Sequence, residues 1–152
     1  MSVNKPVHII GIGSPFGDDQ AGWRVAEALK NRLPPEITVV QLDRPGSSLI
    51  SILEDVDRVI LIDAMQAGGN PGDMRHFSDD EWTDYRTGLS THGLGVFEAL
   101  MLARELDCLP EKLDLYGIEI GSARPGDPPS QAVLSAAGKL ADRITSDWQQ
   151  LK

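Results

Sequence analysis

Short apolar runs alternate along this chain with segments whose apolar residues recur at helical spacing. Four runs are rich in β-branched residues and too short for helices, so they are predicted to be β-strands. These strands span Val7 to Ile12, Ile37 to Leu42, Arg58 to Ile62 and Leu113 to Ile120. A brief extra strand is predicted from Asp73 to Phe77.

Four other segments carry the helical pattern, with apolar residues three and four positions apart on one face. They span Asp19 to Leu33, Leu49 to Leu53, Leu94 to Asp107 and Ser130 to Leu151. Strands that alternate with helices are typical of α/β proteins, in which a mostly parallel sheet is covered on both faces.

The predicted fold class is therefore α/β. We expect a three-layer sandwich, with a mostly parallel twisted sheet of about five strands and helices on both faces. The chain has 152 residues, of which 41% are hydrophobic. That length suits one core and is short for two, so residues 1–152 are predicted to form a single domain.

Carboxylates follow three of the predicted strands. Asp18 and Asp19 come after the glycine-rich turn behind the first strand, Asp43 ends the second, and Asp63 ends the third. Sheets of this kind carry functional groups beyond the carboxyl ends of their strands, so these acids are expected at one edge. His92, just before a predicted helix, is a candidate to complete a metal or catalytic site with them.

Each of these residues also has a purely structural explanation. Asp19 could be the N-cap of the first helix, and Asp63 could end its strand by accepting hydrogen bonds from loop amides. His92 could be an exposed residue at a helix start, although Ser90 or Thr91 would cap that helix better.

The first turn also invites comparison with dinucleotide-binding proteins, which place a glycine-rich loop between a strand and a helix. The spacing here is Gly11-x-Gly13-x-x-x-Gly17, which does not match G-x-G-x-x-G. The turn also brings Asp18 and Asp19 to the helix start, where they would repel a pyrophosphate. A nucleotide site is therefore disfavoured.

Charge and composition exclude further classes of protein. The chain has 14 Lys and Arg against 23 Asp and Glu, a formal net charge of −9, so no nucleic acid is expected as a partner. The one cysteine, Cys108, and the lack of any long apolar run favour a reduced, cytoplasmic protein with no membrane partner. His8 and His76 lie inside predicted strands and are interpreted as structural or solvent-exposed.

Three ordered blocks of this sequence resemble those of the [NiFe]-hydrogenase maturation endopeptidases. They are Gly11-Ile12-Gly13-Ser14-Pro15-Phe16-Gly17-Asp18-Asp19-Gln20-Ala21-Gly22, Leu61-Ile62-Asp63-Ala64 and Ser90-Thr91-His92-Gly93-Leu94-Gly95. The resemblance extends over essentially the whole chain. It departs from the usual family pattern at Ser14, where Asn is more common, and in a first loop that is one residue shorter.

The resemblance implies an aspartic-type endopeptidase that removes the C-terminal extension of a [NiFe]-hydrogenase large-subunit precursor after nickel insertion. By position, Asp19, Asp63 and His92 match the metal-contacting and catalytic residues of the family, and Asp18 and Asp43 are further candidate acids of the cleft. The nickel would belong to the substrate, so no tightly bound cofactor is expected, although another divalent ion could occupy the site in vitro.

Two questions stay open at this point. The general base could be Asp19, Asp43 or Asp63, or the metal could polarise the peptide carbonyl. The alternative function is a non-catalytic metal-binding or accessory protein of hydrogenase assembly on the same fold.

Overall fold

The computed structural model describes residues 7–43, 48–54, 56–78, 81, 96–121, 124 and 126–150. In chain order, its elements are β1 (Val7–Gly13), η1 (Gly17–Gln20), α1 (Ala21–Leu29), β2 (Ile37–Asp43), α2 (Ser48–Leu53), β3 (Arg58–Met65), β4 (Met74–Ser78), α3 (Val96–Glu105), β5 (Lys112–Glu119) and α4 (Gln131–Gln150). Here η1 is a single 3-10 turn and the α elements are α-helices. Within this described part of the chain, no helix combines the length and apolarity needed to cross a bilayer.

The five strands form one sheet in the order β2-β1-β3-β5-β4. All neighbouring pairs are parallel except β4 and β5, which run antiparallel. The predicted extra strand is therefore confirmed, and it lies at the edge of the sheet as β4. An antiparallel edge strand on an otherwise parallel sheet is common in α/β proteins.

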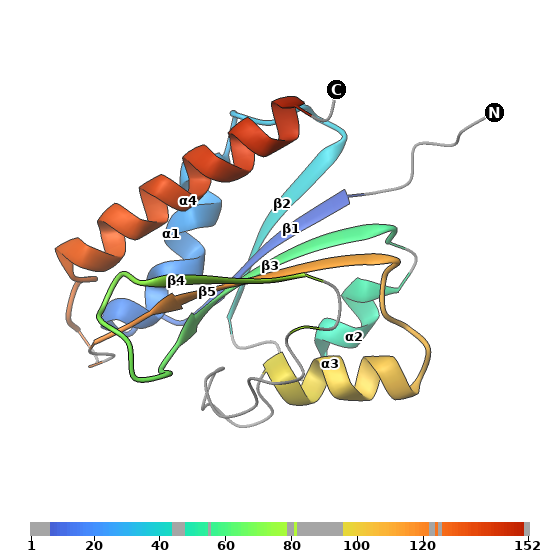
Figure 1. The fold of residues 1–152 in the computed structure, drawn as a ribbon, viewed down its shortest axis with the longest axis horizontal. Helices are drawn as coiled ribbons and strands as arrows, with labels where there is room; N and C mark the ends of the chain where they lie inside the picture. Colours follow the sequence, from blue (N-terminus) through green and yellow to red (C-terminus); the bar gives the residue numbers. More distant parts are fainter. Residues whose placement is uncertain are drawn as a thin grey trace.

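Helices cover both faces of this sheet (Figure 1). Successive residues of a strand point to opposite faces, so each strand supplies both layers of the core. In β1, for example, Ile10 and Ile12 pack with α2 and α3, whereas Ile9 packs with α1 and α4. The predicted three-layer α/β sandwich is confirmed.

The start of α1 lies unusually close to the sheet because two glycines face one another. A Cβ on Gly22 would lie 2.3 Å from the carbonyl oxygen of Ile12 and 2.6 Å from that of Ile62. A Cβ on Gly11 would lie 2.2 Å from the carbonyl oxygen of Gly22. Only glycine therefore allows the first turn of α1 to contact the backbone of β1 and β3.

Two boundaries differ from the sequence prediction by three residues or more. The first helix was expected to run to Leu33, but α1 ends at Leu29 because the chain turns there, with Asn31 at a φ of 67°. The third strand was expected to end at Ile62, but β3 continues to Met65. It does so because β5 runs alongside it, with Asp63 opposite Gly117. Asp63 thus lies inside a strand and not after one.

We predict that Gly22→Ala lowers the free energy of unfolding by about 3 kcal/mol, since the new methyl group has no room between the two carbonyl groups. Gly138→Ala is the matched control, because nothing lies within 4 Å of a Cβ at that position of α4. It should stabilise the protein by up to about 1 kcal/mol through helix propensity. Urea denaturation measures both changes, and equal effects at the two positions would contradict the close approach.

Candidate functional site

The candidate site lies at the end of β1, the strand that has β2 on one side and β3 on the other. The chain goes from β1 to β2 on one side, and then crosses to β3 on the other side of β1. In α/β sheets, the crevice at such a switch point is the usual place for a ligand. Asp19 follows β1 in η1, and Asp63 lies in β3 just beyond the last β1–β3 pair, Gly11 with Ile62.

Asp63 is a buried carboxyl group that is only half satisfied. Its exposed fraction is 2%. Its Oδ1 accepts a hydrogen bond of 2.9 Å from the backbone N–H of Ala64. Its Oδ2 is buried and has no hydrogen-bond partner among the residues that the structure describes. Since buried polar atoms nearly always have partners, this oxygen calls for an explanation.

Asp19 is the second buried acid, with an exposed fraction of 7%. Its Oδ2 accepts a hydrogen bond from the hydroxyl group of the fully buried Ser14. The backbone N–H of Ser14 also donates to the carbonyl oxygen of Asp19, at 3.2 Å. The N-cap position of α1 falls on Gln20, and that of η1 on Phe16. Asp19 is therefore not the N-cap residue that one sequence interpretation allowed.

The two acids influence each other electrostatically. Burial, and next the negative charge of Asp19, raise the pKa of Asp63 from 3.8 to about 8, although the Ala64 N–H acts in the opposite direction. A carboxyl group with so perturbed a pKa, next to a second acid at a switch point, is typical of a functional site.

Asp18 has a different environment from its neighbour. It is 2% exposed, and its carboxylate accepts hydrogen bonds from two backbone N–H groups, those of Gly121 and Ser130. These contacts join η1 to the connection between β5 and α4. Of the adjacent pair, Asp19 is therefore the one that interacts with Asp63.

The other two candidate residues are Asp43, which the structure describes, and His92, which it does not. Asp43 is exposed at the end of β2, where it lies opposite Gly13 in the sheet register. His92 lies outside the described residues. Among the described residues, no three His, Cys, Asp or Glu side chains form a group that could hold a metal. The described part thus brings together two of the three predicted site residues.

Sequence reasoning did not assign a function to Ser14 or to Glu119. Ser14 follows the second glycine of the first turn, and its contact with Asp19 was not visible in a strand-and-helix pattern. Glu119 ends β5 with an exposed fraction of 3%, and its carboxylate accepts the N–H of Ala67 at 3.0 Å. It therefore holds the connection between β3 and β4. In the sequence, the one indication that Glu119 is buried is its position within the predicted apolar strand from Leu113 to Ile120.

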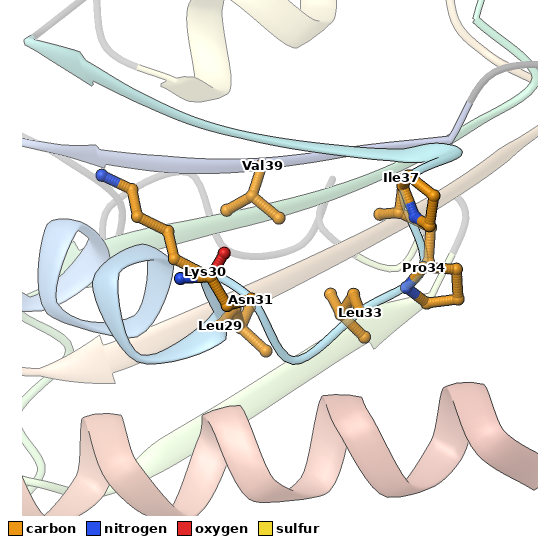
Figure 2. Close-up of a pocket in the computed structure, with 8 residues that line it drawn as sticks. Leu29, Lys30, Asn31, Leu33, Pro34, Ile37 and Val39 are labelled. Atoms are coloured by element: carbon orange, nitrogen blue, oxygen red, sulfur yellow. The ribbon is translucent and has the colours of Figure 1, made fainter.

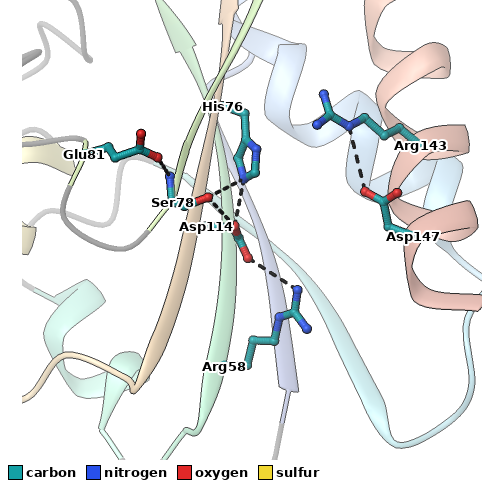
Figure 3. A network of polar contacts seen from close by, with 7 residues as sticks. All are labelled: Arg58, His76, Ser78, Glu81, Asp114, Arg143 and Asp147. Atoms are coloured by element: carbon teal, nitrogen blue, oxygen red, sulfur yellow. Dashed lines mark hydrogen bonds and ion pairs between the residues drawn. The ribbon is translucent and has the colours of Figure 1, made fainter. Parts of the chain in front are cut away.

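A second polar cluster lies around Asp114 in β5 (Figure 3). Its Oδ1 is 2.7 Å from Nε2 of His76, and its Oδ2 is 3.5 Å from Arg58. Ser78 Oγ lies 3.5 Å from the same Nε2. A Ser-His-Asp triad needs the acid and the serine on different ring nitrogens, so this is no triad. His76 also stacks on Tyr116, with ring centroids 4.3 Å apart, which supports its interpretation as a structural histidine.

A pocket of about 380 Å³ lies between the end of α1 and the start of β2 (Figure 2). Its lining includes Leu29, Lys30, Leu33 and Val39, and it contains no carboxylate or imidazole. Ile37, another lining residue, is at the amino-terminal end of β2. The pocket is therefore at the amino-terminal end of the strands, whereas Asp19 and Asp63 lie toward their carboxyl-terminal end.

Comparison with known proteins adds independent information. A family model described as HycI, hydrogenase maturation protease, matches residues 23–147. Among curated relatives, the hydrogenase expression/formation protein HupD of Rhizobium leguminosarum bv. viciae is 31% identical over 92% of this chain and 74% of its own length. HupD of Bradyrhizobium diazoefficiens is 28% identical over 97% of this chain and 81% of its own.

Solved structures of similar proteins share the fold. The hydrogenase maturating endopeptidase HybD from E. coli superposes with a TM-score of 0.83 and 25% identity, covering 95% of this chain and 93% of its own. The [NiFe] hydrogenase maturation protease HycI from Thermococcus kodakarensis gives a TM-score of 0.73 and 26% identity, covering 93% and 91%.

The raised pKa of Asp63 predicts how stability depends on pH. Between pH 4 and 8, the native state holds a proton that the unfolded state has lost, so this group makes stability fall as pH rises, by about 1.4 kcal/mol per pH unit. Asp63→Asn removes that dependence and should be more stable than the parent protein, increasingly so toward pH 8. Denaturation with a chelator present at pH 5, 6, 7 and 8 measures the difference. A difference that does not change with pH would contradict a buried, protonated Asp63.

Proposed function

Because this chain belongs to the hydrogenase maturation protease family, we propose that it is the endopeptidase that removes the C-terminal extension of a [NiFe]-hydrogenase large-subunit precursor. Cleavage would follow nickel insertion, and Asp19, Asp63 and His92 would recognise the nickel held by the substrate. The observation that carries this proposal is the buried Oδ2 of Asp63, which lacks a hydrogen-bond partner among the described residues and belongs to a carboxyl group whose pKa is raised by the charge of Asp19.

The donor set suits a divalent cation of the nickel type. Two carboxylates and one imidazole provide oxygen and nitrogen ligands and leave open positions for the ligands that the substrate itself supplies. A cation would satisfy the unpaired oxygen of Asp63 and favour release of its proton, because it stabilises two neighbouring carboxylates. The site needs no metal of its own in this proposal, because the metal arrives with the precursor.

The proposed place of His92 is consistent with the layers of the fold. Alternation along β3 puts Asp63 on the same face as Leu61 and Met65, which pack with α2 and α3. His92 precedes the first residue of α3, Val96, by four positions in the sequence. The chain that leads into α3 is therefore a suitable source of the third ligand.

In the proposed reaction, Asp19, Asp63 and His92 detect whether the substrate holds nickel and align the peptide bond that is cut. Hydrolysis adds water across the peptide C–N bond, with a proton passed to the leaving amine. A carboxylate of the cleft could take the proton from water, as aspartic-type peptidases do, or the substrate's nickel could polarise the carbonyl group. Ser14 donates its hydroxyl hydrogen to Asp19, so it is engaged and is not proposed as a nucleophile.

We predict that the purified protein shortens the nickel-loaded precursor and leaves the nickel-free precursor intact. Asp63→Ala, Asp19→Ala and His92→Ala should each lower kcat/KM by about a hundredfold or more, because each removes a contact to the metal that aligns the scissile bond. Mass spectrometry of the precursor measures cleavage.

Asp114→Asn is the matched control, since Asp114 is a partly buried acid of β5 that belongs to the structural cluster around His76. It should cleave at the parental rate. A precursor of unchanged length in both nickel states would refute the proposed activity. If the precursor were bound but never cut, and remained bound by Asp63→Ala, the chain would instead be an accessory protein.

A further inference from the structure

Three hydrogen bonds attach η1 to the connection between β5 and α4. Asp18 Oδ1 accepts the N–H of Ser130 at 2.6 Å, and Asp18 Oδ2 accepts the N–H of Gly121 at 2.9 Å. The N–H of Gly17 donates to the carbonyl oxygen of Asp127 at 3.1 Å. The turn that carries Asp19 is thus held by partners more than 100 positions away in the sequence.

The chemistry of position 18 requires a carboxylate. Both donors are backbone N–H groups, so both side-chain atoms must be acceptors. Asparagine would offer one acceptor and would direct its own N–H groups at the second donor. Hydrogen bonds to a charged acceptor are also about twice as strong as those between neutral groups. These bonds compensate for the burial of a third acid, which is adjacent to Asp19 in the sequence.

The turn also has contacts with neighbouring residues of the chain, such as the N–H of Asp19, which donates to the carbonyl oxygen of Phe16 at 2.9 Å. The N-cap residue of η1, Phe16, and that of α1, Gln20, make no side-chain cap hydrogen bond. Ser14 contacts Asp19 from the preceding loop. The close packing of Gly22 connects this part of the chain to the sheet, and the Asp18 contacts connect η1 to the β5–α4 connection.

We propose that Asp18 is a positioning residue, which fixes η1 on the β5–α4 connection so that the carboxylate of Asp19 is held toward Asp63. This inference rests on the proposed function for its catalytic consequence, because Asp19 is there a contact to the substrate's nickel. Its structural consequence is independent of that function. Loss of either Asp18 hydrogen bond loosens the turn and displaces Asp19, even when the fold is retained.

Three variants separate positioning from stability. Asp18→Asn removes one acceptor. Ser130→Pro removes the N–H that donates to Asp18 and also the hydroxyl group, which accepts the N–H of Val133 at 3.4 Å as a cap of α4. Ser130→Ala removes only the hydroxyl group and keeps the N–H. The two Ser130 variants therefore lose the same cap and differ in the bond to Asp18.

The first readout is amide hydrogen exchange at Ser14, whose N–H donates to the carbonyl oxygen of Asp19. Asp18→Asn and Ser130→Pro should each accelerate this exchange by about tenfold or more, and Ser130→Ala should leave it near the parental rate. The second readout is cleavage of the nickel-loaded precursor. The first two variants should lose kcat by about tenfold with KM nearly unchanged, and Ser130→Ala should keep both.

The outcomes separate the two proposals. If all three variants exchange the Ser14 amide alike, Asp18 does not position the turn and the inference is wrong, whatever the activity. If exchange of the Ser14 amide changes as expected but the parent protein cuts neither precursor, the positioning role of Asp18 is supported and the proposed peptidase activity is refuted. If exchange responds and kcat of Asp18→Asn equals that of the parent, the catalytic part of the inference is wrong.

Discussion

The contact of Gly22 with the carbonyl groups of Ile12 and Ile62 is the constraint on which the site depends. It brings the first turn of α1 onto the backbone of β1 and β3 at the point where these two strands separate. The preceding turn, η1, is thereby held over the end of β1, and Asp19 comes next to Asp63. A side chain at position 22 would move the helix and, with it, the geometry of the acid pair.

Burial of two neighbouring carboxyl groups is costly for a folded protein, and this cost argues for a function. Desolvation and the charge of Asp19 together keep Asp63 protonated near neutral pH, and one of its oxygens lacks a hydrogen-bond partner among the described residues. A side chain selected only for stability would satisfy that position better. The same features suit a site that receives a cation from outside and has no need to hold one permanently.

The sequence predicted the layers, the strands and the edge strand β4, because apolar periodicity reports directly which faces are buried. It misjudged the end of β3, because the residues from Asp63 to Met65 pair with residues of β5 that lie 54 positions later in the sequence. It named Asp19 and Asp63 but could not assign Asp18, whose amide partners are over 100 positions away. It also named His92 as a candidate, and the family resemblance favoured that role over an exposed residue at a helix start.

The most direct test of the proposed site is a crystal structure of the protein soaked with Ni²⁺, with the ion located by its anomalous scattering. We expect one ion bound by carboxylate oxygens of Asp19 and Asp63, with the imidazole of His92 as a third ligand and Asp18 still bonded to the Gly121 and Ser130 amides. An ion bound elsewhere, with Asp19 and Asp63 too far apart to share a ligand, would contradict it.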